Sequence, residues 1–105
     1  MENYAENHVL NTPKALAKIK GATELTAICF TGTSNIKVYC GYADGLICIS
    51  DVTNSSNYEW RTLIGHTNKI NNLCYELDQL FSASQDCTVR QWNVKMDTCT
   101  RVYKF

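Results

Sequence analysis

Two stretches of this chain repeat one pattern, and that repetition restricts the fold more than any other feature of the sequence. Residues 38–52 (VYCGYADGLICISDV) align with residues 80–94 (LFSASQDCTVRQWNV), which places Asp44 and Asp86 42 positions apart. Upstream, residues 27–30 align with residues 72–75 at an offset of 45. The two offsets differ because of a turn, where changes in length are tolerated. Self-similarity at this period indicates an architecture of stacked supersecondary units.

Each unit has the pattern of four short β-strands. Runs of four to eight residues, some alternating between apolar and polar side chains, are separated by turn sequences such as Asp44-Gly45 and Thr53-Asn54-Ser55-Ser56. The runs predict strands at about 25–30, 36–42, 46–52 and 58–64, and again at about 69–75, 79–84, 88–94 and 99–105. Four antiparallel strands in roughly 42 residues are typical of a β-propeller blade. The predicted fold is therefore all-β, with two four-stranded antiparallel blades of an incomplete propeller.

Composition excludes several classes of function. The chain carries ten Lys and Arg residues against ten Asp and Glu residues, so it lacks the basic footprint of a nucleic-acid-binding or membrane-surface protein. No apolar run approaches the roughly 20 residues that span a bilayer. The N-terminus has no basic and apolar start typical of a signal peptide, so we expect a cytoplasmic protein, with the nucleus as the alternative.

The six cysteines do not predict a metal site or a disulfide framework. No two of them form a C-x-x-C pair, which leaves no zinc-ligand spacing, and no cofactor is expected. Reduced thiols are the default in the cytosol. Cys29 and Cys74 occupy equivalent positions in the two units, so we interpret them as small core residues.

The second unit resembles a WD40 repeat. It has a Gly65-His66 opening, the turn entry Ser82-Ala83-Ser84-Gln85-Asp86, and Trp92-Asn93 where the family has Trp-Asp. In that family a His, a Ser or Thr, an Asp and a Trp form a hydrogen-bonded tetrad inside each blade. The resemblance implies a structural tetrad here of His66, Ser82 (or Ser84, on the same face), Asp86 and Trp92.

The first unit departs further from the family. Ala22 stands at the position of the histidine and Ser50 at that of the tryptophan, while Asp44 remains. We therefore divide the chain into a polar N-terminal tail (1–13), an outer strand plus a first, degenerate repeat (14–64), and a second repeat (65–105). Residues 14–20 also allow a helix that starts at Thr12 and Pro13, but their register before Gly21 favours the outer strand.

The resemblance implies a protein-interaction scaffold and no enzyme. WD40 proteins bind partners on one face of the propeller, through residues at the start of the inner strand and just before the tetrad aspartate. By position these protein-binding residues are Lys69, Asn71 and Gln85 in the second unit, and Glu24, Thr26 and Ala43 in the first. The expected partners are other proteins or peptides.

Three alternative readings remain beside the scaffold. The blades could recruit substrate for an enzyme such as a ubiquitin ligase or a kinase, or the chain could be a truncated, non-functional product. The set His66, Ser82 and Asp86 also has the residue types of a hydrolytic triad, but the family places it inside a blade, without oxyanion donors.

Trp60 either anchors a partner or packs on an outer strand.

Two blades cannot close a propeller, which typically needs four to eight. The missing blades come either from a longer chain or from self-association that completes the ring. We expect the apolar residues Ile28, Phe30, Leu73 and Tyr75 of the inner strands to lose cover in an isolated chain.

Overall fold

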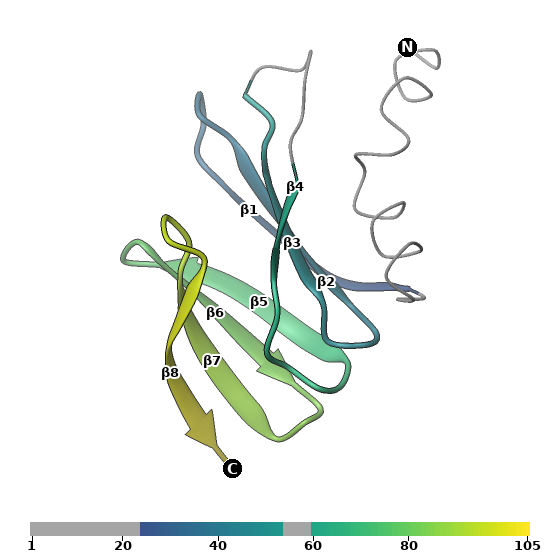
Figure 1. The fold of residues 1–105 in the computed structure, drawn as a ribbon. Coiled ribbons are helices and arrows are strands. Elements are labelled where there is room, and N and C mark those ends of the chain that lie inside the picture. Colours follow the sequence, from purple (N-terminus) through teal and green to yellow (C-terminus); the bar gives the residue numbers. More distant parts are fainter. Residues whose placement is uncertain (1–23, 54–59) are drawn as a thin grey trace.

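The computed structural model describes residues 24–53 and 60–105, and every regular element in them is a β-strand (Figure 1). The first sheet contains β1 (Leu25–Thr31), β2 (Lys37–Tyr42), β3 (Ile47–Asp51) and β4 (Trp60–Leu63), in that order. The second sheet contains β5 (Ile70–Glu76), β6 (Gln79–Ser84), β7 (Thr88–Asn93) and β8 (Thr98–Lys104). Neighbouring strands are consecutive in the sequence and antiparallel.

This architecture confirms the predicted fold class: two four-stranded antiparallel sheets that do not close into a ring. Every predicted strand is present, with ends that differ by at most one residue where they can be compared. The described residues contain no helix that could span a membrane. The polar tail and the outer strand predicted at 14–20 lie outside the described residues.

The turn between the second and third strands has the same hydrogen-bonding geometry in the two sheets. The side chain of Asp44 accepts a hydrogen bond from the backbone N–H two residues on, at 3.1 Å, and Asp86 does the same at 2.9 Å. This short-range bond is the reason that aspartate favours tight turns. The residue that follows has a positive φ in both, 97° at Gly45 and 72° at Cys87. Glycine adopts this conformation freely, whereas Cys87 holds it under strain.

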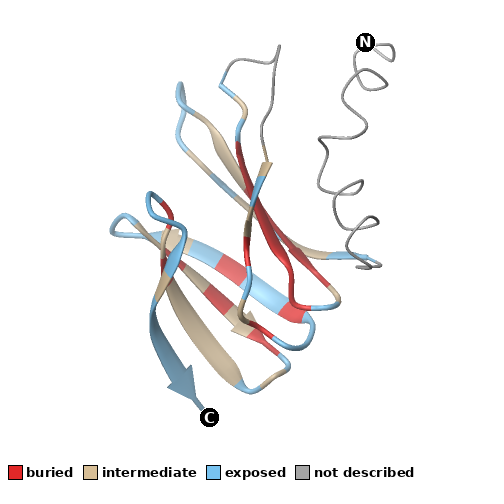
Figure 2. Cartoon of the chain, in the orientation of Figure 1, coloured by how far each residue is buried: buried red, intermediate tan, exposed pale blue. Residues whose placement is uncertain are grey.

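The main core lies between the two sheets, which pack face to face. Figure 2 shows the buried residues along β2 and β3 and in separate stretches of the second sheet. The buried residues of this interface are Tyr39, Ile47, Ile49, Leu63, Ile70, Leu73, Leu80, Trp92 and Val94. A smaller cluster of Cys40, Tyr42, Leu46 and Cys48 belongs to the first sheet alone.

The expectation about uncovered inner-strand residues is right for the first sheet and wrong for the second. Ile28 is 58% exposed and Phe30 is 68% exposed. Leu73, by contrast, is buried, and the ring of Tyr75 stacks on that of Tyr39 with centroids 5.5 Å apart. The difference arises because β5 packs against β1 and β2 of the first sheet, while β1 has no equivalent neighbour among the described residues.

The two predicted core cysteines also differ. Cys29 is half-buried and packs against the core between the sheets, as expected. Cys74 is exposed, so the prediction that it is a core residue is wrong. Its side of the second sheet is the side that no described sheet covers.

The two sheets approach each other closely at Gly41. A Cβ atom at this position would lie 2.5 Å from Cγ2 of Ile70, so only glycine lets β5 come this near. Beside it, the Thr26 hydroxyl lies 2.6 Å from the carbonyl oxygen of Ile70 and donates a hydrogen bond across the interface. Both contacts lie beside a β-bulge at the start of β1 and a matching one at the start of β5.

Replacing Gly41 by Ala should destabilise the chain by about 1–3 kcal/mol, because the added methyl group overpacks the contact with Ile70. Strand propensity alone predicts the opposite sign, since Ala is favoured over Gly inside regular structure by about 0.5–1 kcal/mol. Thermal unfolding of the parent and of Gly41→Ala decides between them. A melting temperature equal to or above that of the parent would contradict this account of the interface.

Candidate functional site

Four side chains of the second sheet form one continuous chain of hydrogen bonds. The Trp92 indole donates to Ser82 Oγ at 2.8 Å, and Ser82 Oγ lies 2.6 Å from Nε2 of His66. On the other side of the ring, Nδ1 of His66 lies 2.8 Å from Asp86 Oδ2. A proton on Nδ1 satisfies every partner: the indole donates to serine, serine donates to Nε2, and Nδ1 donates to the carboxylate. The structure thus brings together all four residues of the tetrad.

Asp86 connects this hydrogen-bonded network to the turn that precedes β7. Its carboxylate accepts hydrogen bonds from the Thr88 hydroxyl at 2.6 Å, from the Thr88 N–H at 2.9 Å and from the Thr67 N–H at 3.1 Å. Burial by itself would raise the pKa of Asp86, but the hydrogen bonds from Thr88, His66 and Thr67 outweigh it and hold the pKa well below its ordinary value. The ionised carboxylate is therefore part of the folded structure.

The structure separates the two serines that the sequence left as alternatives. Ser82 lies within the tetrad, whereas Ser84 donates to the carbonyl oxygen of Asn68 at 2.9 Å and accepts from the Asp86 N–H at 3.0 Å. Thr88 is a further member that the sequence reasoning missed. Its position two residues after the aspartate, where a hydroxyl can bond back to the carboxylate, was the available signal.

The geometry does not suit hydrolysis by a serine nucleophile. Ser82 is fully buried, between the imidazole of His66 and the indole of Trp92. Its oxygen already accepts from the indole, and a substrate carbonyl could reach it only by displacing the core. Among the described residues, no group of three or more His, Cys, Asp or Glu side chains is arranged to hold a metal ion.

The first sheet fills the equivalent positions with different residues. Cys40 occupies the position of Ser82, and Ser50, which is buried, that of Trp92. Ala22, at the histidine position, lies outside the described residues. Burial raises the pKa of the Cys40 thiol to about 12, with a further contribution from Cys48 directly opposite on β3. The Cys40 position therefore holds a neutral thiol where the second sheet has the hydroxyl of Ser82.

The predicted protein-binding residues meet at one end of the two sheets. We call this the loop end; it consists of the β2–β3 turn (43–46), the β4–β5 connection (64–69) and the β6–β7 turn (85–87). The Ala43 N–H donates to the carbonyl oxygen of Glu24 at 2.9 Å, and the Gln85 N–H donates to that of Lys69 at 2.9 Å. The side chains of Glu24, Lys69 and Gln85 are exposed, and Ala43 is half-buried.

Thr26 and Asn71 occupy equivalent positions with different surroundings. The Thr26 hydroxyl faces Ile70 of the neighbouring sheet, as described above, so it holds the two sheets together. Asn71 is exposed. Of the six residues predicted to bind protein, Thr26 is therefore the one whose side-chain donor is already used within the fold.

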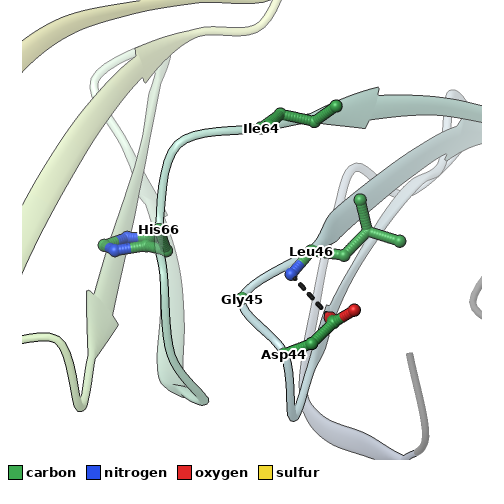
Figure 3. Close-up of a pocket in the computed structure, with 5 residues that line it drawn as sticks. All are labelled: Asp44, Gly45, Leu46, Ile64 and His66. Atoms are coloured by element: carbon green, nitrogen blue, oxygen red, sulfur yellow. Dashed lines mark hydrogen bonds between the residues drawn. The ribbon is translucent and has the colours of Figure 1, made fainter. Parts of the chain in front are cut away.

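A crevice of about 160 Å³ opens at the loop end between the β2–β3 turn and the β4–β5 connection. It is lined by Asp44, Gly45, Leu46, Ile64 and His66. Figure 3 shows the His66 imidazole pointing toward the second sheet, so that histidine borders the crevice without directing its ring into it. Ile64 is 71% exposed at the rim. The sequence reasoning missed this crevice, because its lining residues come from two segments that are well separated in the sequence, the β2–β3 turn and the β4–β5 connection.

Trp60, considered as a partner anchor or as a packed residue of an outer strand, is half-buried on β4. It packs against the smaller cluster that contains Cys40 and Cys48. This contact favours the packing role.

Substitutions that break the tetrad should lower the free energy of unfolding even where they remove little side-chain volume. Ser82→Ala leaves the indole of Trp92 and Nε2 of His66 without partners, which predicts a loss of about 1–3 kcal/mol. Trp92→Ala removes a large buried side chain and predicts a loss of about 3–5 kcal/mol. Denaturant unfolding measures both, with Ser34→Ala, an exposed turn serine, as the control expected to stay within about 0.5 kcal/mol. Parent-like stability of Ser82→Ala would mean that the network adds nothing.

The depressed pKa of Asp86 predicts acid sensitivity with a definite sign. In the unfolded chain the carboxyl titrates near about 3.9, while in the folded chain its pKa is lower. The stability it contributes is therefore fully present above that range and is lost as the pH falls toward the folded value. The melting temperature of the parent should drop between about pH 5 and pH 2 more steeply than that of Asp86→Asn. Parallel curves for the two proteins would contradict the assignment.

Comparison with known proteins agrees with this geometry. Residues 57–93 match the family model described as "WD domain, G-beta repeat". The chain is 33% identical over 79 residues to the mouse protein named WD repeat and HMG-box DNA-binding protein 1, a match that covers 73% of this chain and 7% of the mouse protein. It is 36% identical over 70 residues to human pre-mRNA-processing factor 19, covering 65% of this chain and 14% of that protein.

A solved structure also shares the fold. The computationally designed Ika4 protein superposes with a TM-score of 0.62 and 25% sequence identity over 73% of this chain and 45% of its own. The chain spans only a small part of the two natural relatives, so these matches bear on the repeat unit. The sequence match, the two four-stranded blades and the hydrogen-bonded His, Ser, Asp and Trp together place the chain in the WD40-repeat family.

Proposed function

We propose that the chain is a non-catalytic module that binds a protein or peptide segment across its loop end. The observation that carries the proposal is the arrangement of this end. Two repeats bring equivalent residues to the same surface, and each set is held by a backbone hydrogen bond from the β2–β3 or the β6–β7 turn. WD40 repeats are in general protein-interaction elements, which supports the same function.

The chemistry of the loop end suits an extended peptide. The exposed carboxylates of Glu24 and Asp44 come from the first sheet, and the exposed ammonium of Lys69 comes from the second. Between them, Ile64 and Leu46 line the crevice, which is wide enough for one apolar side chain of a partner. An apolar anchor surrounded by polar and charged groups is the usual anatomy of a recognition site.

The scaffold beneath this surface is rigid. Gly45 lies so close to the β4–β5 connection that a Cβ atom there would meet the His66 carbonyl oxygen at 2.5 Å. The carboxylate of Asp86 in turn accepts from the Thr67 N–H in the same connection. The tetrad therefore serves binding indirectly, because it fixes the backbone on which Lys69 and Ile64 stand.

A peptide library displayed on phage and selected on the parent chain tests the proposal. Peptides that bind the parent should lose at least about tenfold in affinity toward Lys69→Glu and toward Ile64→Ser, since a few central residues carry most of the binding energy of an interface. Both side chains are exposed, so the substitutions leave the core intact.

Lys95→Glu is the matched control, because Lys95 is also an exposed lysine and lies in the β7–β8 turn at the opposite end of the sheets. Its affinity for the selected peptides should equal that of the parent. Peptides that respond to Lys95→Glu and not to Lys69→Glu would place the binding surface elsewhere, and a library that yields no binder would oppose the function itself.

A further inference from the structure

The crevice at the loop end combines aliphatic walls with a single charged group. Leu46 and Ile64 supply the aliphatic surface, and Asp44 supplies a carboxylate. Figure 3 shows the side chains of Leu46 and Asp44 extending to the same side of the turn backbone, with Ile64 beyond Leu46. The other ionisable residue of the lining, His66, turns its ring toward the second sheet. The carboxylate of Asp44 is therefore the charge that a group in the crevice meets.

The fold uses only one oxygen of this carboxylate. Oδ1 of Asp44 accepts the hydrogen bond from the Leu46 N–H that shapes the turn, and no group in the described part of the chain bonds to Oδ2. In the second repeat both oxygens of Asp86 are used, Oδ1 by Thr88 and Oδ2 by His66. The first repeat has Leu46 where the second has Thr88. Asp44 therefore keeps one acceptor for a group from outside the chain.

The backbone beside Asp44 also presents an acceptor, while its donors are engaged. The carbonyl oxygen of His66 lies so close to Gly45 that a Cβ atom there would be 2.5 Å from it. The N–H of Gly45 donates to the carbonyl oxygen of Tyr42 at 3.1 Å, and that of Leu46 donates to Asp44. A polar group that enters the crevice from this side must therefore bring hydrogen-bond donors.

We propose that the crevice binds the side chain of a lysine residue in the partner peptide. This assignment rests on the function proposed above and names the apolar group that the crevice takes. The methylene groups of the lysine pack against Leu46 and Ile64, and its ammonium group donates to Oδ2 of Asp44. Lysine side chains commonly bury the apolar stem while the charged end stays at a polar rim.

The single unused oxygen favours lysine over arginine. A guanidinium group binds a carboxylate best through two parallel hydrogen bonds, one to each oxygen. At Asp44 such a pair would compete with the Leu46 N–H for Oδ1 and so disturb the turn. An ammonium group is a compact charge with three donors, and it reaches Oδ2 without this competition.

The charges around the crevice indicate where the rest of the peptide lies. Glu24 is exposed, and its carbonyl oxygen accepts from the Ala43 N–H, so a second carboxylate stands beside the β2–β3 turn. Lys69 is exposed on the side of the second sheet, where its carbonyl oxygen accepts from the Gln85 N–H. A peptide with a lysine at the crevice and an acidic residue toward the second sheet is complementary to both sides.

A double-mutant cycle between the chain and its peptides tests the assignment. The probes are the peptides selected by phage display on the parent, and copies in which their shared lysine is replaced by norleucine, which keeps an aliphatic stem without the charge. This replacement should weaken binding to the parent at least about tenfold, as the loss of a hydrogen bond to a charged group predicts. Toward Asp44→Asn it should change the affinity by less than about twofold. Isothermal titration calorimetry measures the four affinities.

Asp44→Asn leaves the turn intact, because the asparagine Oδ1 still accepts the hydrogen bond from the Leu46 N–H. Asp78→Asn is the matched control, since Asp78 is an exposed aspartate in the β5–β6 turn at the opposite end of the sheets. This variant should bind both peptides as the parent does. A third copy of each peptide, with arginine in place of the lysine, should bind the parent less tightly than the lysine peptide.

The results distinguish failure of the lysine site from failure of the proposed function. Selected peptides that lose affinity toward Ile64→Ser but share no lysine overturn the lysine site and leave the loop end as the binding surface. The same conclusion follows if norleucine weakens binding equally toward the parent and Asp44→Asn, or if arginine binds as tightly as lysine. A library that yields no peptide sensitive to Ile64→Ser overturns both proposals.

Discussion

The contact between β5 and the first sheet is the interaction on which the rest of the structure depends. Each four-stranded sheet alone would leave in water the apolar face that it turns toward the other sheet. The contacts that β5 makes with the first sheet bury the facing apolar surfaces of both sheets, through Ile70, Leu73 and Tyr75. The close approach requires the absence of a side chain at Gly41. The glycine at this position therefore sets how closely the two sheets can pack.

The buried polar network of the second sheet adds order to this packing. Its four members come from the β4–β5 connection, β6, the β6–β7 turn and β7, so the hydrogen bonds join segments that apolar contacts alone would hold less specifically. The first sheet keeps the same fold with Cys40 and Ser50 at equivalent positions. The same four-stranded arrangement therefore forms with different residues at the positions of Ser82 and Trp92.

The loop end and the interface between the sheets differ in chemistry. The loop end is polar and charged and surrounds one small crevice, which suits the recognition proposed above. The interface between the sheets is apolar and closely packed around Gly41 and Ile70. Both depend on the same backbone, since the β-bulges at the start of β1 and β5 lie next to the turns of the loop end.

The sequence by itself determined the local features of this protein. The repeat, the strands and the aspartate turns follow from periodicity and from turn sequences, and the resemblance to a WD40 repeat implied the set His66, Ser82 (or Ser84), Asp86 and Trp92. Each of these features depends on residues within one repeat. Tertiary structure decided what depends on the packing of one repeat against the other. It selected Ser82 over Ser84, turned Thr26 toward Ile70, exposed Cys74 while it covered Leu73, and formed the crevice beside Ile64. Equivalent positions in the two repeats carry similar residues, so only their neighbours in space distinguish a buried side chain from an exposed one.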